Sequence, residues 1–266
     1  MKRITFIVAA PALVLTTSIF GVVNTANAVE YYNLLMPEKR PGSPYPPLPR
    51  YNTSLTMTGT NPDQYPVEVM RHHIIPDNRL KGFWNKMVNR NELAGEGKAL
   101  LQGMRDSVRQ YNMTLVPADR QQVINILDEI IERNYQHDAD RPPPDGFDNL
   151  AQVYEWLPGN LFIGPKGGGE RYQRVDDPGD QFERNSDVIV GATAYSDLRN
   201  ACIQMRDYLA DAGQAAQAES ASRYLGKTAR GKKSPYPVES PNWLIVRGGA
   251  YRINYTVDKQ NPCPFG

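Results

Sequence analysis

The sequence predicts an α+β fold, a mostly helical domain with short β elements. Several segments place apolar residues at a spacing of 3.6, which is typical of amphipathic helices. The β-rich runs are short and bounded by turn residues, and no internal repeat or regular strand–helix–strand alternation occurs. With 266 residues, 40% of them apolar, the chain is long enough to bury a sizeable core.

The composition excludes several classes of protein. Thirty Lys and Arg balance 29 Asp and Glu, which rules out a strongly basic nucleic-acid coat and a disordered polyelectrolyte. Any contact with nucleic acid must therefore depend on a local patch. Two Cys exclude a disulfide-dense scaffold and a four-Cys zinc site.

Residues 1–28 are predicted to be a signal peptide that is cleaved after Ala28. Lys2 and Arg3 precede an uncharged apolar run at 4–23, and Ala26-Asn27-Ala28 supplies the small residues of a cleavage site. We therefore expect a secreted or periplasmic protein without stable membrane association. An uncleaved membrane anchor is the alternative reading, because the run is about as long as a bilayer core requires.

Export predicts a disulfide bond. Compartments outside the cytoplasm are oxidising, so the two Cys of the chain, Cys202 and Cys263, are expected to pair and to join the tail to a helix. Two unpaired thiols are the alternative.

The N-terminal half begins with an extended segment and a hairpin. Residues 29–53 are rich in Pro and predict an extended surface segment or linker, followed by a single domain at 54–266. Runs at 55–58 and 67–75 predict two strands joined by a turn at 59–63. Pro76 ends the second strand, and Asp77 is expected to cap a helix whose apolar face is Leu80, Phe83, Trp84, Met87 and Val88.

Helices dominate the rest of the chain. They are expected at 92–111 and 118–134, in a short stretch through Leu150, Val153 and Trp156, in a block around 198–209, and at 212–229. A short strand is predicted at 161–163. Residues 243–246 and 251–255 predict a C-terminal hairpin around Gly248-Gly249.

Two adjacent histidines are the sharpest local feature. They occur in the string Arg71-His72-His73-Ile74-Ile75-Pro76 at the end of the second predicted strand. Successive side chains of a strand point to opposite faces, so one imidazole could face a metal while the other accepts a proton from water. A pair of histidines that only packs is the alternative.

This string resembles the opening motif of the HNH, or endonuclease VII-like, nucleases of the His-Me finger superfamily. The later run Gly159-Asn160-Leu161-Phe162-Ile163 is similar to the strand that carries the central Asn of that family. The combination also occurs in secreted toxin nucleases, for which an immunity protein is a further partner. The resemblance implies a small ββα-metal core, with a helical insertion at about 90–157 inside the finger.

The resemblance also assigns roles. His72 would bind the metal, His73 would act as general base, and Asn160 would complete the metal shell or hold His73. The expected ion is Mg²⁺, with Mn²⁺ or Zn²⁺ as alternatives, and the reaction is phosphodiester hydrolysis in a DNA or RNA substrate.

The family's later His has no counterpart in this chain. Asp176 or Asp177 is the expected oxygen ligand in its place, although Asp-Asp-Pro-Gly is also a common turn. Arg174 is expected at the scissile phosphate, and Arg71 and Arg171 are expected to bind substrate, with a solvated face as the alternative. Asn85, Asn89 and Asn91 could replace Asn160 in a more compact finger.

Two hypotheses about function remain open from the sequence. The first is an exported, metal-dependent nuclease, plausibly a toxin or effector. The second is an exported interaction protein without catalysis, in which the His pair is structural.

Overall fold

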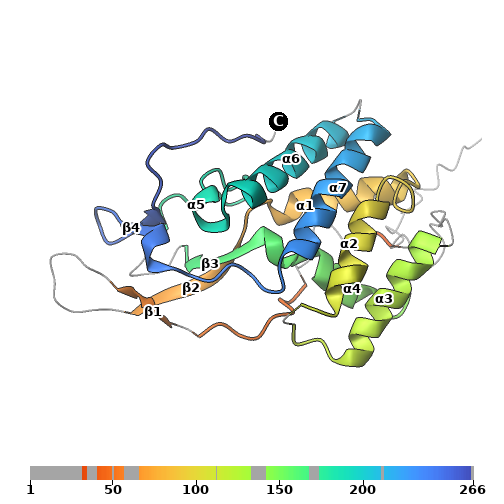
Figure 1. Ribbon diagram of the computed structural model, residues 1–266, viewed down its shortest axis with the longest axis horizontal. Helices are drawn as coiled ribbons and strands as arrows, with labels where there is room; N and C mark the ends of the chain where they lie inside the picture. The colour runs from red at the N-terminus through yellow and green to blue at the C-terminus, as the bar shows by residue number, and fades with distance from the viewer. Residues whose placement is uncertain are drawn as a thin grey trace, which may run out of the picture.

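The computed structural model describes residues 32–34, 41–49, 51–56, 66–111, 113–132, 142–167, 174–210 and 213–264. The predicted signal peptide at 1–28 lies outside these residues. Helices and two small antiparallel sheets make up the described part, which confirms the α+β class (Figure 1).

The larger sheet contains the predicted N-terminal hairpin and the strand predicted at 161–163, although its first strand begins at Tyr51, four residues before the run predicted at 55–58. Strands β1 (Tyr51–Thr56), β2 (Pro66–His73) and β3 (Leu161–Pro165) are antiparallel in the order β1-β2-β3. The expected turn at 59–63 lies outside the described residues. Strand β2 is therefore the central strand, and it carries both histidines at its end.

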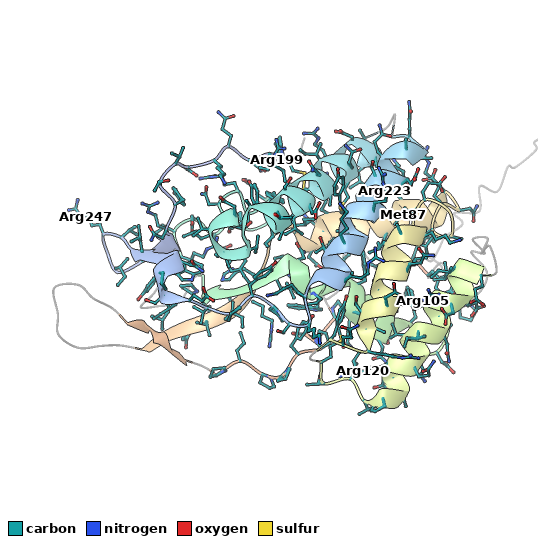
Figure 2. All side chains as sticks on the ribbon, viewed as in Figure 1. Met87, Arg105, Arg120, Arg199, Arg223 and Arg247 are labelled. Carbon is teal, nitrogen blue, oxygen red and sulfur yellow. A yellow bond between two sulfur atoms is a disulfide. The ribbon has the colours of Figure 1, made fainter. Side chains whose placement is uncertain are left out.

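The smaller sheet is the predicted C-terminal hairpin. Strand β4 (Trp243–Ile245) pairs with β5 (Tyr251–Ile253). Gly248 and Gly249, between them, have φ angles of 90° and 80°, a region that only glycine enters without strain. The hairpin lies near the larger sheet (Figure 1). The side chain of Arg247, in the turn of the hairpin, points away from the molecule (Figure 2).

Most of the helices gather at the other end of the larger sheet, whereas α5 (Asp187–Val190) is drawn above β3 (Figure 1). The helices are α1 (Asp77–Asn89), α2 (Lys98–Val108), α3 (Pro117–Glu132), α4 (Phe147–Glu155), α5, α6 (Ala192–Leu209) and α7 (Ala215–Gly231), with 3₁₀ turns η1 (Pro158–Asn160) and η2 (Ser240–Asn242). Helix α7 packs against both α2 and α6. A Cβ on Gly103 of α2 would lie 2.5 Å from the carbonyl oxygen of Gly226 on α7, so only glycine permits this approach.

The apolar face predicted for the first helix is confirmed, since Leu80, Phe83, Trp84, Met87 and Val88 are all fully buried. Two local expectations differ from the structure. Pro76, not Asp77, is the N-cap of α1, because Asp77 already lies in the first turn, where its carboxylate pairs with Lys81. Helix α2 begins at 98 rather than 92, since 91–97 form turns that contain two glycines.

The Pro-rich segment packs more closely than a surface linker would. The Tyr45 side chain is only 4% exposed, and its hydroxyl donates to the carbonyl oxygen of Trp156 at 2.6 Å. The Trp156 indole donates in turn to the carbonyl oxygen of Pro41 at 2.9 Å. These aromatic anchors hold residues 41–49 against the domain.

The predicted disulfide bond is confirmed. Cys202 on α6 is bonded to Cys263 in the tail, with 6.0 Å between their Cα atoms, and both residues are fully buried. Within the described ranges, no helix is long and apolar enough to cross a membrane.

Removing this bond should destabilise the fold. The crosslink closes a loop of 61 residues, and its loss by Cys202→Ser with Cys263→Ser should lower the free energy of unfolding by about 2 to 4 kcal/mol. Urea denaturation of oxidised, reduced and substituted protein measures the change. Equal midpoints for the three samples would contradict this role.

Candidate functional site

The two motif segments lie side by side in the structure. Strand β2 pairs with β3 so that His72 is opposite Phe162 and His73 is opposite Leu161. The chain between His73 and Asn160 forms helices α1 to α4 before it returns to the same sheet. The long separation in sequence therefore does not separate the segments in space.

Hydrogen bonds of Asn160 join the end of β2 to the start of β3. Its carbonyl oxygen accepts the Ile74 N–H at 2.9 Å, and its side-chain Oδ1 accepts the Ile75 N–H at 2.8 Å. Its Nδ2 donates to the carbonyl oxygen of Ile75 at 2.9 Å. The hydrogen bonds found for the buried carboxamide are thus to backbone, which differs from the two roles expected from the sequence, a metal ligand or a partner of the His73 ring.

Glycines allow this arrangement on both sides of the Asn. A Cβ on Gly159 would lie 2.5 Å from the carbonyl oxygen of Thr228 on α7, and one on Gly164 would lie 2.5 Å from the Trp243 ring. Strand β3 therefore fits between α7 and the C-terminal hairpin only with hydrogen at both positions.

His72 points into the protein. Its side chain is only 6% exposed, and its ring stacks on Phe162 with centroids 5.1 Å apart. Nε2 lies 2.9 Å from the carbonyl oxygen of Pro165, which can only accept, so Nε2 carries the proton and donates. Nδ1 then accepts from Arg174 at 3.2 Å. Burial and the Arg174 charge lower the pKa of His72 to about 4, so the ring is neutral at pH 7.

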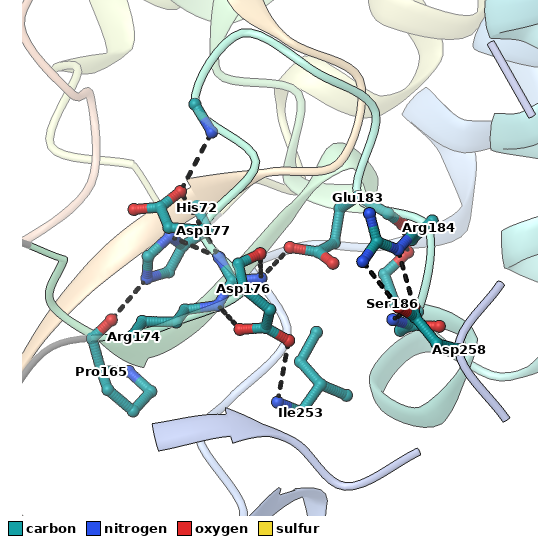
Figure 3. A network of polar contacts seen from close by, with 12 residues as sticks. His72, Pro165, Arg174, Asp176, Asp177, Glu183, Arg184, Ser186, Ile253 and Asp258 are labelled. Carbon is teal, nitrogen blue, oxygen red and sulfur yellow. Dashed lines mark hydrogen bonds and ion pairs between the residues drawn. The ribbon is translucent and has the colours of Figure 1, made fainter. Parts of the chain in front are cut away.

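Arg174 is the centre of the polar network around His72 (Figure 3). Its side chain is fully buried, and it reaches Asp176 at 3.1 Å and Asp177 at 3.7 Å, with a further close ion pair to Glu183. The guanidinium lies over the rings of Phe162 and Trp243. This placement differs from the expected phosphate clamp, because the guanidinium is buried and its nitrogens are directed at carboxylates of the protein.

The two aspartates have structural partners as well. Asp176 accepts the Ile253 N–H at 3.1 Å, which ties β5 to the network. Asp177 accepts the Gly179 N–H at 3.3 Å within its own turn, as the turn reading of Asp-Asp-Pro-Gly predicts. The described residues contain no group of three or more His, Cys, Asp or Glu arranged to hold a metal ion.

His73 points to the opposite face of β2 and is partly exposed. Its Nε2 lies 2.8 Å from the carbonyl oxygen of Glu155, and its ring lies 5.0 Å from that of Trp156. Arg71, two residues earlier, shares this face, donates to the carbonyl oxygen of Pro46 and lies over the Tyr45 ring. The strand thus separates a buried His from an accessible one, as strand alternation predicts.

A buried charged cluster next to His73 was missed from the sequence. Glu155 is only 2% exposed, and Lys81 lies 3.5 Å from both its carboxylate and that of Asp77. Burial and the neighbouring Asp77 raise the pKa of Glu155 to about 8. Glu155 is the single charged residue in the apolar run 153–157, a pattern from which a buried charge could have been predicted.

The other asparagine candidates lie away from the histidines. Arg171 lies outside the described residues. Asn85 bonds the backbone of Leu34, and Asn89 bonds Asn33, so both hold the N-terminal segment against α1. Asn91 sits in the turn after that helix. Asn160 is therefore the asparagine that the structure brings to the histidines.

Comparison with known proteins adds little. No protein-family model matches the chain, and no solved structure matches it. The chain is 30% identical over 140 residues to "Putative protein p9" of Acyrthosiphon pisum secondary endosymbiont phage 1, a match that covers 50% of this chain and 37% of that protein. The chain thus spans little more than a third of this relative's length, and the family is not established.

Asn160→Ala should weaken the fold and the β2–β3 junction. The Ile75 N–H and carbonyl would both lose their buried partner, at a cost of about 2 to 4 kcal/mol. Thermal and urea unfolding measure the loss. Asn254→Ala, which removes an exposed amide that bonds Pro241, is the matched control and should stay near the stability of the parent. Equal stabilities of the two variants would show that the Asn160 side chain does not stabilise the junction between β2 and β3.

Glu155→Gln should remove a pH dependence of stability. Because its pKa is raised in the fold, the native state holds more protons than the unfolded state between about pH 4.5 and 8. The stability that Glu155 contributes is therefore lost as pH rises, by at most about 1.4 kcal/mol per pH unit. Urea unfolding of parent and variant from pH 5 to 8 should show the variant gaining relative to the parent. A difference in unfolding free energy between parent and variant that does not change with pH would contradict the raised pKa of Glu155.

Proposed function

We propose that this chain is an exported nuclease that hydrolyses phosphodiester bonds, with its active site at the end of β2. The observation that supports the proposal is the antiparallel pairing of the two motif segments, with Asn160 bonded to the backbone directly after the histidines. The resemblance noted in the sequence requires this pairing, although 87 positions separate His73 from Asn160.

His73 is the general base of the proposed reaction. The carbonyl oxygen of Glu155 can only accept a hydrogen bond, so it holds the proton on Nε2 and leaves the lone pair on Nδ1. That nitrogen takes a proton from the water that attacks phosphorus, the bond from phosphorus to the leaving oxygen breaks, and the leaving oxygen takes up a proton from solvent water. Trp156 and the Glu155 carbonyl fix the ring orientation.

Arg71 is the cation proposed to bind the substrate. It lies on the same strand face as His73, two residues away, where strand geometry places side chains about 7 Å apart. Its guanidinium is partly exposed, so a phosphate could replace the Pro46 carbonyl as its partner. The near-zero net charge of the chain means that such local contacts carry the binding.

The residues around His72 do not fit the divalent metal that the resemblance implies. Both ring nitrogens of His72 are bonded within the protein, and the Asn160 carboxamide bonds the backbone of Ile75 through both Oδ1 and Nδ2. Arg174 already occupies the position between the carboxylates. No step of the proposed reaction is therefore assigned to a metal.

Export is part of the proposal. The disulfide bond between Cys202 and Cys263 supports a secreted or periplasmic location, because such bonds persist in oxidising compartments. Cleavage of the signal peptide after Ala28, a toxin role and an immunity partner belong to the same proposal.

The second candidate is an exported interaction protein with a structural His pair. The satisfied and buried state of His72 favours it, since a histidine bonded at both nitrogens needs no ligand. His73 is the general base in the first candidate and has only a structural role in the second.

Cleavage assays on the mature chain separate them. Plasmid DNA and structured RNA are incubated with Mg²⁺, Mn²⁺ or EDTA, and we expect cleavage that falls by about 10²- to 10⁴-fold in His73→Ala. His73→Gln, whose amide can still donate to Glu155, should be equally inactive, and unfolding midpoints establish that both variants fold. No cleavage by the parent, or undiminished cleavage by folded His73→Ala, would favour the interaction protein.

A further inference from the structure

We propose that a cavity beside α4 binds a small organic cation, an alkylammonium or alkylguanidinium ion, with its charged head at the Glu155 carboxylate and its apolar stem along the cavity wall. The cavity has a volume of about 320 Å³ and lies between α4, Lys81 of α1 and the segment Pro41-Gly42. It is separate from the proposed reaction, since Glu155 holds His73 through its backbone carbonyl oxygen and not through its carboxylate.

Two carboxylates share one ammonium group next to this cavity. The Lys81 nitrogen lies 3.5 Å from an oxygen of Asp77 and 3.5 Å from Oε2 of Glu155. Charge-assisted hydrogen bonds from nitrogen to a carboxylate are normally about 2.7 to 2.9 Å long, so Lys81 holds both carboxylates only loosely. Within the part of the chain that the structure describes, the buried Oε2 accepts no hydrogen bond. The cluster therefore has one cation fewer than it has carboxylates.

Charge balance in this cluster requires either a proton or a second cation. Glu155 is buried, and its burial together with Asp77 raises its pKa to about 8, so its carboxyl group carries a proton at pH 7. A cation in the cavity would supply the missing positive charge, and the carboxyl proton would pass to solvent, because a buried carboxylate is stable when it is paired. Glu155 lines the cavity, so the head of a ligand can reach it.

The rest of the lining suits an organic cation with a short stem. Leu34, Pro143 and Phe147 give the cavity apolar walls against which an alkyl chain can pack. Asp148, exposed in the first turn of α4, also lines the cavity and adds a negative charge. An anion would meet more acidic than basic side chains. The volume is at the lower end of the range for small-molecule sites, which favours a small free ion.

The test is the binding of n-propylguanidinium to the full mature chain, measured by calorimetry and two-dimensional NMR. We expect a dissociation constant of about 1 mM or below, with the largest chemical-shift changes at the amides of Ala151 and Gln152, which line the cavity. n-Butylammonium should bind similarly. Butyrate and butyramide, which resemble it in size but lack its positive charge, should bind at least about tenfold more weakly.

The affinity should increase with pH. Propylguanidinium keeps its charge at every pH used, so the dependence reports on the protein. Because the ligand pairs with the ionised form of Glu155, the affinity should rise by up to about tenfold from pH 6 to 7 and level off above about pH 8. Asp77 and Lys81 are the charged groups next to this carboxyl, and His73 bonds its backbone. Calorimetry at pH 7 in buffers of different ionisation enthalpy should show that binding releases a proton.

Glu155→Gln should weaken propylguanidinium binding by about tenfold or more, because its amide has the same shape without the charge. It should also remove the pH dependence, which a titration of His73 would leave in place. Glu219→Gln, which removes an exposed carboxylate of α7, is the matched control and should bind like the parent. Ala151→Met, which fills the cavity and leaves its charge unchanged, should weaken binding as well, and unfolding midpoints establish that each variant folds.

Three outcomes would overturn the inference. They are no binding of propylguanidinium by the parent, undiminished binding by folded Glu155→Gln, and binding of butyrate or butyramide as tight as that of butylammonium. These readouts require no cleavage of nucleic acid, so an inactive parent would refute the proposed function and leave this inference standing.

Discussion

The hydrogen bonds of Asn160 are the constraint on which the rest of the structure depends. They join the end of β2 to the beginning of β3 and so decide where a chain segment of more than 80 residues must leave and return. The cost of closing such a long segment grows only slowly with its length, so three buried hydrogen bonds and the strand pairing can define the junction. Helices α1 to α4 lie in the chain segment whose two ends this junction brings together.

A second set of contacts gives the two faces of β2 different properties. On one face, Arg174 joins His72, the loop at 174–186 and the C-terminal hairpin into one buried network (Figure 3). On the other face, His73 is partly exposed and held by the backbone of α4. Adjacent residues of identical chemistry therefore differ in burial and in partners, and only the accessible one suits proton transfer.

Much of the fold could be predicted from local patterns. The strand–turn signals predicted the hairpins, and helical spacing predicted the buried face of α1 from Leu80 to Val88. The number of cysteines, together with the expected export, predicted the disulfide bond. The start of α2 was misplaced because Gly95 and Gly97 interrupt an otherwise helical pattern. The roles of Asn160 and Arg174 could not be read locally, since their partners are distant in sequence, and a buried Arg resembles an exposed one until its neighbours are known.

Hydrogen exchange at Ile75 tests the central constraint most directly. This amide lies beyond the last residue of β2, and its partner is the Asn160 side chain. If the Ile75 amide donates to the Asn160 side chain in solution, native-state exchange measured by NMR should show this amide protected nearly as strongly as the amides of Val67 to His73 inside β2. Exchange at the rate of an exposed loop amide would contradict the account, because the two motif segments would then lack the bond that holds them together.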